Sequence, residues 1–337
     1  LRLQDLFVAN ISLASLGVYV LSRRWIAGFT ESFFAGAIYG FGPFALGLAK
    51  FHSGSGFSFG AMPWLFCPAV FGPKGKFKPL RIPLSLLPFL VIVLFFQVAA
   101  RFGLYPIPIK LKLHGAEMAG LLAPLVAAKR NMTLVGFYHI PLASLIMGFA
   151  MLLVPLEGLS RGGILQRGRF LKGLAIKRLG IVMIFAVATI FAFCESFFDI
   201  SPIIWLAVSV LCCSILIGAG MQGLISAGYG DRKWILFTAV FMGVAAIVTL
   251  LFATKYFQTF AGLGSGYARL LTEEAKMYIL GAITIAIFFF MTRTKFTAHS
   301  AGRLMVLLKT GLLCATMGLD IFFGARFVVD RIFFVGV

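Results

Sequence analysis

The stretch 181-IVMIFAVATIFAF-193 contains no charged residue, and 279-ILGAITIAIFFFM-291 repeats this pattern nearer the end of the chain. Both runs are continuously apolar, whereas a membrane-spanning β-strand alternates apolar and polar residues over about ten positions. Helices and closed barrels are the two structures that satisfy every backbone polar group inside a bilayer. The two runs therefore predict transmembrane helices.

The composition of the whole chain agrees with this prediction. Of its 337 residues, 61% are hydrophobic and 12% are charged, whereas a soluble domain is about 45–50% apolar and about 25% charged. No globular core of this size could bury so much apolar surface, so lipid must solvate a large part of it. Because no soluble segment or low-complexity tail interrupts the pattern, residues 1–337 are predicted to form a single integral-membrane domain.

The spans follow from apolar runs of about 17–25 residues. We predict an all-α polytopic transmembrane bundle with about nine spans, within a range of about 8–10. The predicted spans are 6–22, 26–49, 82–100, 133–156, 179–196, 202–226, 234–254, 277–292 and 304–324.

Two further segments are harder to place. Residues 51–72 have the length of a span but are rich in glycine, serine and proline. If they cross, the chain has ten spans and its start moves outside; we prefer nine because this is the least lipid-like segment. Residues 115–128 are too short to cross and predict a re-entrant or interfacial helix.

The net charge of +19, from 30 lysines and arginines, is concentrated between the apolar runs. Cytoplasmic loops of membrane proteins are enriched in these residues, and anionic headgroups attract them. We therefore expect lipid contacts at the cytoplasmic face and no nucleic-acid partner, in what is expected to be a bacterial inner membrane. The residues expected to contact headgroups are Arg161, Arg167, Arg169, Lys172, Lys177 and Arg178.

Acidic residues within or beside the spans are the candidates for transport or ion binding, because burying a charge in a bilayer costs about 2.5–3.5 kcal/mol on insertion scales. Glu195 and Asp199 share one face if their helix continues that far. Structural interpretations compete: Asp199 precedes a predicted helix start, where an acid suits the helix dipole, and Glu31 is expected to pair with Arg24, seven residues earlier on the same face. The acidic candidates are Glu31, Glu195, Asp199 and Asp320, and Gln222 is added as an uncharged polar residue that is well placed to line a pathway.

For Asp320, an ion pair with Lys309 or Arg326 that anchors the last helix is favoured over a role in transport. His139 is expected to form a hydrogen bond between helices. The histidines lack the i,i+4 spacing of a single-helix metal site, so no metal or other cofactor is expected.

Glycines at small-x-x-x-small spacing predict close helix packing. Gly36 and Gly40 form one such pair, and Ser214 and Gly218 form another. The structural interpretation is favoured over a broken helix that lines a pathway.

The leading functional hypothesis is a permease-like transporter or channel for a small solute, ion or lipid. The first alternative is a noncatalytic subunit of a larger membrane complex, with other membrane subunits as partners. The second is an enzyme acting on lipid-linked substrates, which would need the cluster of polar residues between Arg101 and Glu117. Enzymatic activity is not favoured, because the sequence contains no nucleophile elbow, P-loop or paired-acid motif.

Overall fold

The structure of the chain, a computed structural model, describes residues 3–25, 28–51, 53–72, 75–102, 120–129, 136–153, 180–194, 200–256, 265–292 and 299–334. These residues form helices joined by turns. The elements are α1 (Leu3–Trp25), α2 (Phe29–Phe41), α3 (Pro43–Phe51), α4 (Ser53–Leu65), α5 (Cys67–Phe71), η1 (Gly75–Leu80), α6 (Arg81–Arg101), α7 (Pro124–Lys129), α8 (His139–Leu153), the helix Gly180–Phe193, α10 (Pro202–Ser226), η4 (Tyr229–Asp231), α11 (Arg232–Ala253), α13 (Ser265–Met291) and α14 (His299–Phe334).

Five helices in the described part of the chain are long and apolar enough to cross a membrane. They are Arg81–Arg101, Pro202–Ser226, Tyr229–Ala253, Gly266–Met291 and Leu304–Asp330. Shorter apolar helices cover Phe59–Phe71, His139–Ala150 and Gly180–Phe193. The all-helical architecture is that expected of a helical membrane protein.

Two predicted segments differ from the structure in detail. The predicted span 26–49 is broken into α2 and α3 at Gly42, which is extended (φ −69°, ψ 160°). Proline has no backbone N–H and disfavours helical geometry in the residue before it, so Pro43 accounts for the break. The segment 115–128, predicted to be re-entrant or interfacial, is described only from residue 120 onwards and contributes most of the six-residue helix α7.

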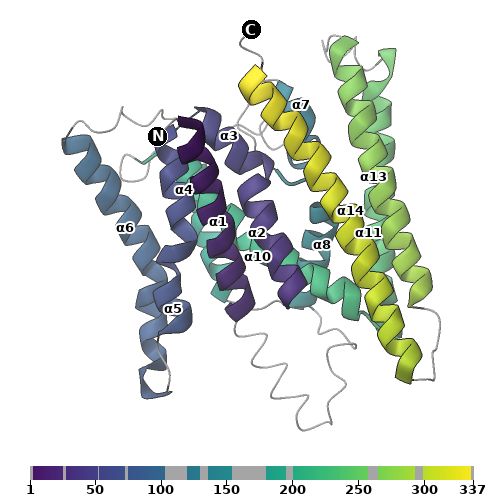
Figure 1. The fold of residues 1–337 in the computed structure, drawn as a ribbon, viewed down its shortest axis with the longest axis horizontal. Coiled ribbons are helices and arrows are strands. Elements are labelled where there is room, and N and C mark those ends of the chain that lie inside the picture. Colours follow the sequence, from purple (N-terminus) through teal and green to yellow (C-terminus); the bar gives the residue numbers. More distant parts are fainter. Residues whose placement is uncertain are drawn as a thin grey trace.

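The start of α1 and the end of α14 lie at the same side of the bundle (Figure 1). An odd number of crossings places the two ends of a chain on opposite sides. The preferred nine-span arrangement therefore fits this geometry less well than the ten-span alternative, in which 51–72 also crosses.

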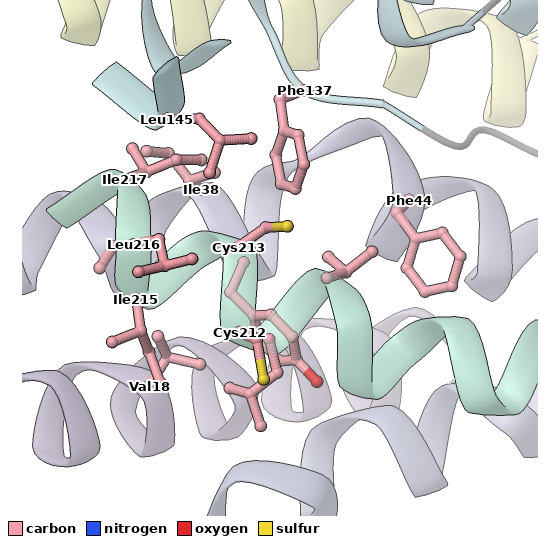
Figure 2. Close-up of a cluster of buried hydrophobic side chains, with 14 of the residues drawn as sticks. Val18, Ile38, Phe44, Phe137, Leu145, Cys212, Cys213, Ile215, Leu216 and Ile217 are labelled. Atoms are coloured by element: carbon pink, nitrogen blue, oxygen red, sulfur yellow. The ribbon is translucent and has the colours of Figure 1, made fainter. Parts of the chain in front are cut away.

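The core is built around α10, which is buried along its whole apolar length. Side chains of Cys212, Cys213, Ile215, Leu216 and Ile217 meet residues of the surrounding helices in one cluster. Figure 2 shows these contacts, with Val18 from α1, Ile38 from α2, Phe44 from α3 and Leu145 from α8 around the central helix. By contrast, α6 lies at the edge of the bundle and exposes most of its apolar surface (Figure 1).

Glycines allow the closest approaches between helices. A Cβ added at Gly220 of α10 would overlap the carbonyl oxygen of Ser144 in α8. A Cβ added at Gly36 or Gly40, the predicted pair of α2, would overlap Ser15 of α1, and a Cβ at Gly218 would lie 2.9 Å from the carbonyl oxygen of Glu31. Close packing through small residues is therefore confirmed at Gly36, Gly40 and Gly218, and it also fixes α8 against α10.

Candidate functional site

A buried polar cluster joins three helices that are far apart in sequence. His139 is the first residue of α8, Glu274 lies in α13, and Asp320 lies in α14. Their exposed fractions are 1%, 0% and 1%. Burying one charged group within a bilayer is costly, so three ionisable groups gathered in one place form the first candidate for a functional site.

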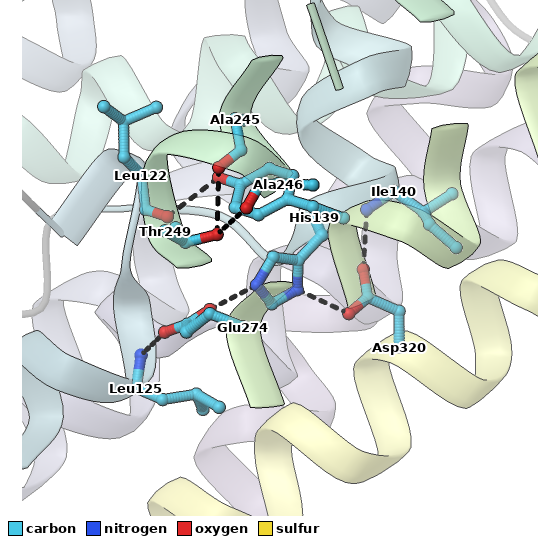
Figure 3. Close-up of polar contacts among 10 residues, drawn as sticks. Leu122, Leu125, His139, Ile140, Ala245, Ala246, Thr249, Glu274 and Asp320 are labelled. Atoms are coloured by element: carbon cyan, nitrogen blue, oxygen red, sulfur yellow. Dashed lines mark hydrogen bonds and ion pairs between the residues drawn. The ribbon is translucent and has the colours of Figure 1, made fainter. Parts of the chain in front are cut away.

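The imidazole of His139 lies between the two carboxylates (Figure 3). Its Nδ1 lies 2.9 Å from Oδ1 of Asp320, and its Nε2 forms a hydrogen bond with Oε2 of Glu274. Both nitrogens of the ring are therefore engaged, and the histidine cannot also ligate a metal in this arrangement. Among the described residues, no group of three or more His, Cys, Asp or Glu side chains has the arrangement of a metal site.

Backbone donors occupy the remaining carboxylate oxygens. The Leu125 N–H donates to Oε1 of Glu274 at 2.6 Å, and the Ile140 N–H donates to Oδ2 of Asp320 at 2.6 Å. Each carboxyl group thus forms one hydrogen bond with the imidazole and accepts one from the backbone. This arrangement satisfies buried oxygens that would otherwise carry a large desolvation cost.

The hydrogen bonds fix how many protons the cluster holds. Each contact between a ring nitrogen and a carboxylate oxygen needs one hydrogen, and neutral imidazole supplies only one. The second proton makes either an imidazolium or a carboxylic acid, and in both cases the three side chains carry a net charge of −1. Losing a proton would place a nitrogen lone pair against a carboxylate oxygen, so the cluster couples its proton content to its hydrogen bonds.

Two tyrosines enclose the cluster. The Tyr278 ring lies edge-on to His139, with 4.6 Å between ring centroids, and its hydroxyl donates to the Leu122 carbonyl at 2.8 Å. Tyr138, directly before His139, donates to the Phe41 carbonyl at 2.9 Å. These hydroxyls bond to backbone carbonyls, so they support the elements around the cluster without competing for its carboxylates.

The cluster lies close to one boundary of the apolar region. Exposed ion pairs form between Lys276 and Glu273 at 2.8 Å on α13, and between Arg326 and Asp330 at 3.7 Å on α14. Exposed charges avoid hydrocarbon, so these pairs mark where it ends. Glu274 is adjacent to the first pair, and Asp320 lies six residues before Arg326, or about 9 Å along a helix at about 1.5 Å per residue.

Of the predicted site residues that the structure describes, Asp320 alone belongs to this cluster. The predicted ion pair of Asp320 with Lys309 or Arg326 is wrong. Lys309 donates to the Ala227 carbonyl at 3.3 Å, and Arg326 pairs with Asp330. The prediction that His139 bonds between helices is confirmed.

Glu31 and Gln222 lie outside the hydrogen bonds of the cluster. Glu31 is partly buried in the first turn of α2, where a carboxylate suits the helix dipole. The predicted pairing of Glu31 with Arg24 is wrong, because the Arg24 guanidinium lies 6.0 Å from the Phe71 ring centroid and no ion pair joins Arg24 to Glu31 in the described structure. Gln222 is partly buried on α10, and its carbonyl accepts from the Ser226 hydroxyl.

The remaining predicted residues fall outside the part of the chain that the structure describes. These are the acidic pair Glu195 and Asp199 and the basic loop 161–178 with its six expected headgroup contacts. The polar residues 110–117 of the enzyme hypothesis also lie there.

Sequence reasoning missed Glu274. The predicted span began at residue 277, because the charges at Arg269, Glu273, Glu274 and Lys276 suggested a loop. In the structure α13 begins at Ser265 and carries these charges within the helix. The available signal was helical spacing: Glu274 lies four residues before Tyr278 and on a different face from the exposed Glu273–Lys276 pair.

The fold and site together describe an all-helical chain with the architecture expected of a helical membrane protein and with a histidine held between two carboxylates in its interior. Comparisons add no family to this description: no protein-family model, curated protein or solved structure matches the chain.

Proposed function

We propose that the protein is a permease-like transporter whose working cycle takes up and releases a proton at the cluster of His139, Glu274 and Asp320. The observation that supports this proposal is the imidazole held between two buried carboxylates from different helices. Chains of Asp, Glu and His within the membrane are typical of proton relays in pumps and transporters. The substrate moved with the proton would be a small solute, ion or lipid.

A change of proton content supplies a means to move helices. The same hydrogen bonds that bind protons also connect α8, α13 and α14. A step that adds or removes a proton is expected to break at least one hydrogen bond of the cluster, either between the three side chains or to the backbone, which alters how the surrounding helices are held together. Transport needs such a link between ion binding and conformation, because a ligand shifts a conformational equilibrium only through different interactions with its two states.

For the topology we propose ten passes through a cytoplasmic membrane of the bacterial type. The start of α1 and the end of α14 lie on the same side, which supports an even number of membrane crossings. The basic residues at the end of α1 and the start of α11 support the assignment of the opposite side to the cytoplasm. In this arrangement the cluster lies nearer the outer boundary. Contacts between anionic headgroups and the basic loop 161–178 stay a prediction.

The experiment that tests the function uses purified protein in proteoliposomes on a solid-supported membrane. A rapid pH change at constant salt is expected to give a transient charge displacement in the wild type. We expect Glu274→Gln and Asp320→Asn to reduce it by at least about tenfold, because an amide has no carboxyl group to protonate. Glu273→Gln and Asp330→Asn remove exposed carboxylates on the same two helices, and these control variants should retain it.

Two outcomes would contradict this proposal. One is a folded wild-type protein that shows no pH-driven charge displacement. The other is a normal displacement in both buried variants, which would place proton exchange elsewhere. Thermal unfolding in detergent, run on every variant, separates loss of proton exchange from loss of fold.

The side of α14 that faces away from the bundle favours the alternative, a noncatalytic subunit of a membrane complex. Gly311 and Ala315 are exposed there, and a Cβ at Gly311 would meet no neighbouring atom within 4 Å. Small residues at this spacing suit packing against another transmembrane helix. Native mass spectrometry after mild detergent extraction tests this alternative, because a stoichiometric hetero-complex would support it and an isolated monomer or homo-oligomer would weaken it.

A further inference from the structure

Two hydrogen bonds connect the segment 120–129, which contains α7, to α13 at and beside the cluster. One runs from the Leu125 N–H to Oε1 of Glu274, and the other runs from the Tyr278 hydroxyl to the Leu122 carbonyl. Figure 1 places α7 toward the side of the bundle where α13 begins and α14 ends. This is also the side of the exposed ion pairs, so the segment lies between the cluster and the nearer membrane boundary.

Each oxygen of the Glu274 carboxylate already takes part in one hydrogen bond. Its Oε2 bonds to Nε2 of His139 and its Oε1 accepts from the Leu125 N–H, so both neighbours are donors when His139 carries both ring protons. A protonated carboxyl has an O–H that needs an acceptor, and a donor facing this O–H cannot provide one. Protonation of Glu274 while His139 keeps both its protons therefore weakens both contacts, because a neutral carboxyl is a poorer acceptor than a carboxylate, and it breaks the contact whose donor faces the new O–H.

The contact with Leu125 is the one expected to break. His139 is held on its other side by Asp320, and the second oxygen of Asp320 is bound to the backbone of α8. Leu125 belongs to a helix of only six residues. Moving this short element disturbs fewer buried contacts than moving the fifteen-residue helix α8, and elements with fewer buried contacts open at a lower free-energy cost.

We propose that the segment 120–129 is a gate, and that it opens the cluster toward the nearer boundary when Glu274 takes up a proton. This inference rests on the proposed function. The incoming proton comes from bulk water at that boundary and binds an oxygen of Glu274, and the Leu125 N–H loses its acceptor. The titratable groups that face Glu274 are His139 and Tyr138 from α8, Asp320 from α14, and Tyr278 from α13 itself.

A cysteine in the buried side of the segment reports the opening. Ala127 is 4% exposed and packs in a small cluster with Ile11, Leu46 and Val328, whereas Leu122 of the same segment is 45% exposed. We would introduce Ala127→Cys or Leu122→Cys after replacing Cys67, Cys194 and Cys314, the described cysteines that are not buried. Reaction with a hydrophilic maleimide is then measured in lipid nanodiscs, and the Leu122→Cys rate corrects for the pH dependence of thiol reactivity.

The gate predicts a definite pattern of corrected rates at position 127. Acidification is expected to raise the reaction rate at least about tenfold, which corresponds to an equilibrium constant for opening that is about tenfold larger. Glu274→Gln should abolish this rise, because its amide oxygen still accepts from Leu125 at every pH. Tyr278→Phe should raise the rate at neutral pH by removing the second tie. The matched control, Tyr39→Phe, loses a buried hydroxyl bond to the Phe59 carbonyl, outside the cluster and the segment 120–129, and should behave as the parent.

Hydrogen exchange of the unmodified wild type gives a second measurement that needs no substitution. The amides of residues 120–129 should lose protection on acidification relative to those of α10, after correction for intrinsic rates. A pH-independent rate at position 127 with unchanged protection would overturn the gate, while intact pH-driven charge displacement would leave the proposed function standing. Absence of that displacement would instead contradict the proposed function itself.

Discussion

Replacing either carboxylate of the cluster by its amide is expected to select one tautomer of His139. In Glu274→Gln, the amide oxygen accepts from Leu125 and the NH2 group faces Nε2, which must then be an acceptor; the ring proton lies on Nδ1, bound to Asp320. In Asp320→Asn the same reasoning, applied to Ile140, places the ring proton on Nε2. Both variants hold a neutral imidazole, but the two tautomers are opposite.

The expected loss of stability follows from the bonds that change. Hydrogen bonds to charged groups contribute about 1.5–3 kcal/mol and those between neutral groups about 0.5–1.5 kcal/mol. In Glu274→Gln the bonds from residue 274 to Leu125 and His139 both become neutral. Part of the loss is offset because one charged group fewer is buried, so each single variant should lower the free energy of unfolding by about 1–3 kcal/mol.

The double variant should be worse than the sum of its parts. With amides at both positions, two NH2 groups face a ring that offers only one acceptor nitrogen. Turning either amide over places its NH2 group against the N–H of Leu125 or Ile140, so one buried donor stays unsatisfied in every arrangement. This unsatisfied donor should cost about 1–3 kcal/mol beyond additivity.

Two measurements test these expectations. Solid-state NMR of protein labelled with 15N-histidine reports the tautomer, and the chain has only four histidines, so a His139→Asn spectrum assigns the relevant signal. Reversible unfolding in mixed micelles gives the free energies of unfolding. The same tautomer in both single variants, or strict additivity in the double variant, would refute the hydrogen-bond scheme.

Three further perturbations follow from the structure. His139→Ala should lower the free energy of unfolding by about 3–5 kcal/mol, because it leaves two buried carboxylates without their shared donor; unfolding in mixed micelles measures this, and a loss below about 1 kcal/mol would contradict the pairing. Gly220→Ala should destabilise by about 1–3 kcal/mol through its clash with α8, whereas Gly243→Ala, whose Cβ meets open space, should be neutral or stabilising; thermal unfolding that ranks them the other way would show the packing to be wrong. Cys194 is exposed and should react with maleimide in the folded protein, whereas the buried Cys213 should react only after unfolding; mass spectrometry of labelled peptides decides between these outcomes.

The helical membrane architecture was predictable because lipid solvation leaves a direct mark on composition. Apolar runs such as 202–226 coincide with helices in the structure, since the bilayer demands both length and hydrophobicity from a crossing segment. The break at Gly42 was less visible, because hydropathy stays high across it and only Pro43 indicates the interruption.

Only part of the site was predictable, because the residues that form it are far apart in the sequence. Asp320 and His139 stood out as polar groups in apolar runs, but their pairing joins residues 181 positions apart. Local partners of Asp320 appeared sufficient on sequence grounds. Glu274 was missed because a buried acid and an exposed one contribute equally to hydropathy, and only the packing of α13 against α8 distinguishes it from Glu273.

The central position of α10 has a consequence for how the protein is made. This helix is as apolar as α6, which faces outward, although none of its apolar window reaches the surface of the bundle. In the assembled bundle α10 is surrounded by other helices, and this packing does not by itself require a lipid-soluble sequence. The helices α11, α13 and α14 are synthesised after it, so α10 must reside in the bilayer before its neighbours are complete. Its hydrophobicity therefore serves insertion into the bilayer, whereas its glycines serve close packing in the assembled bundle.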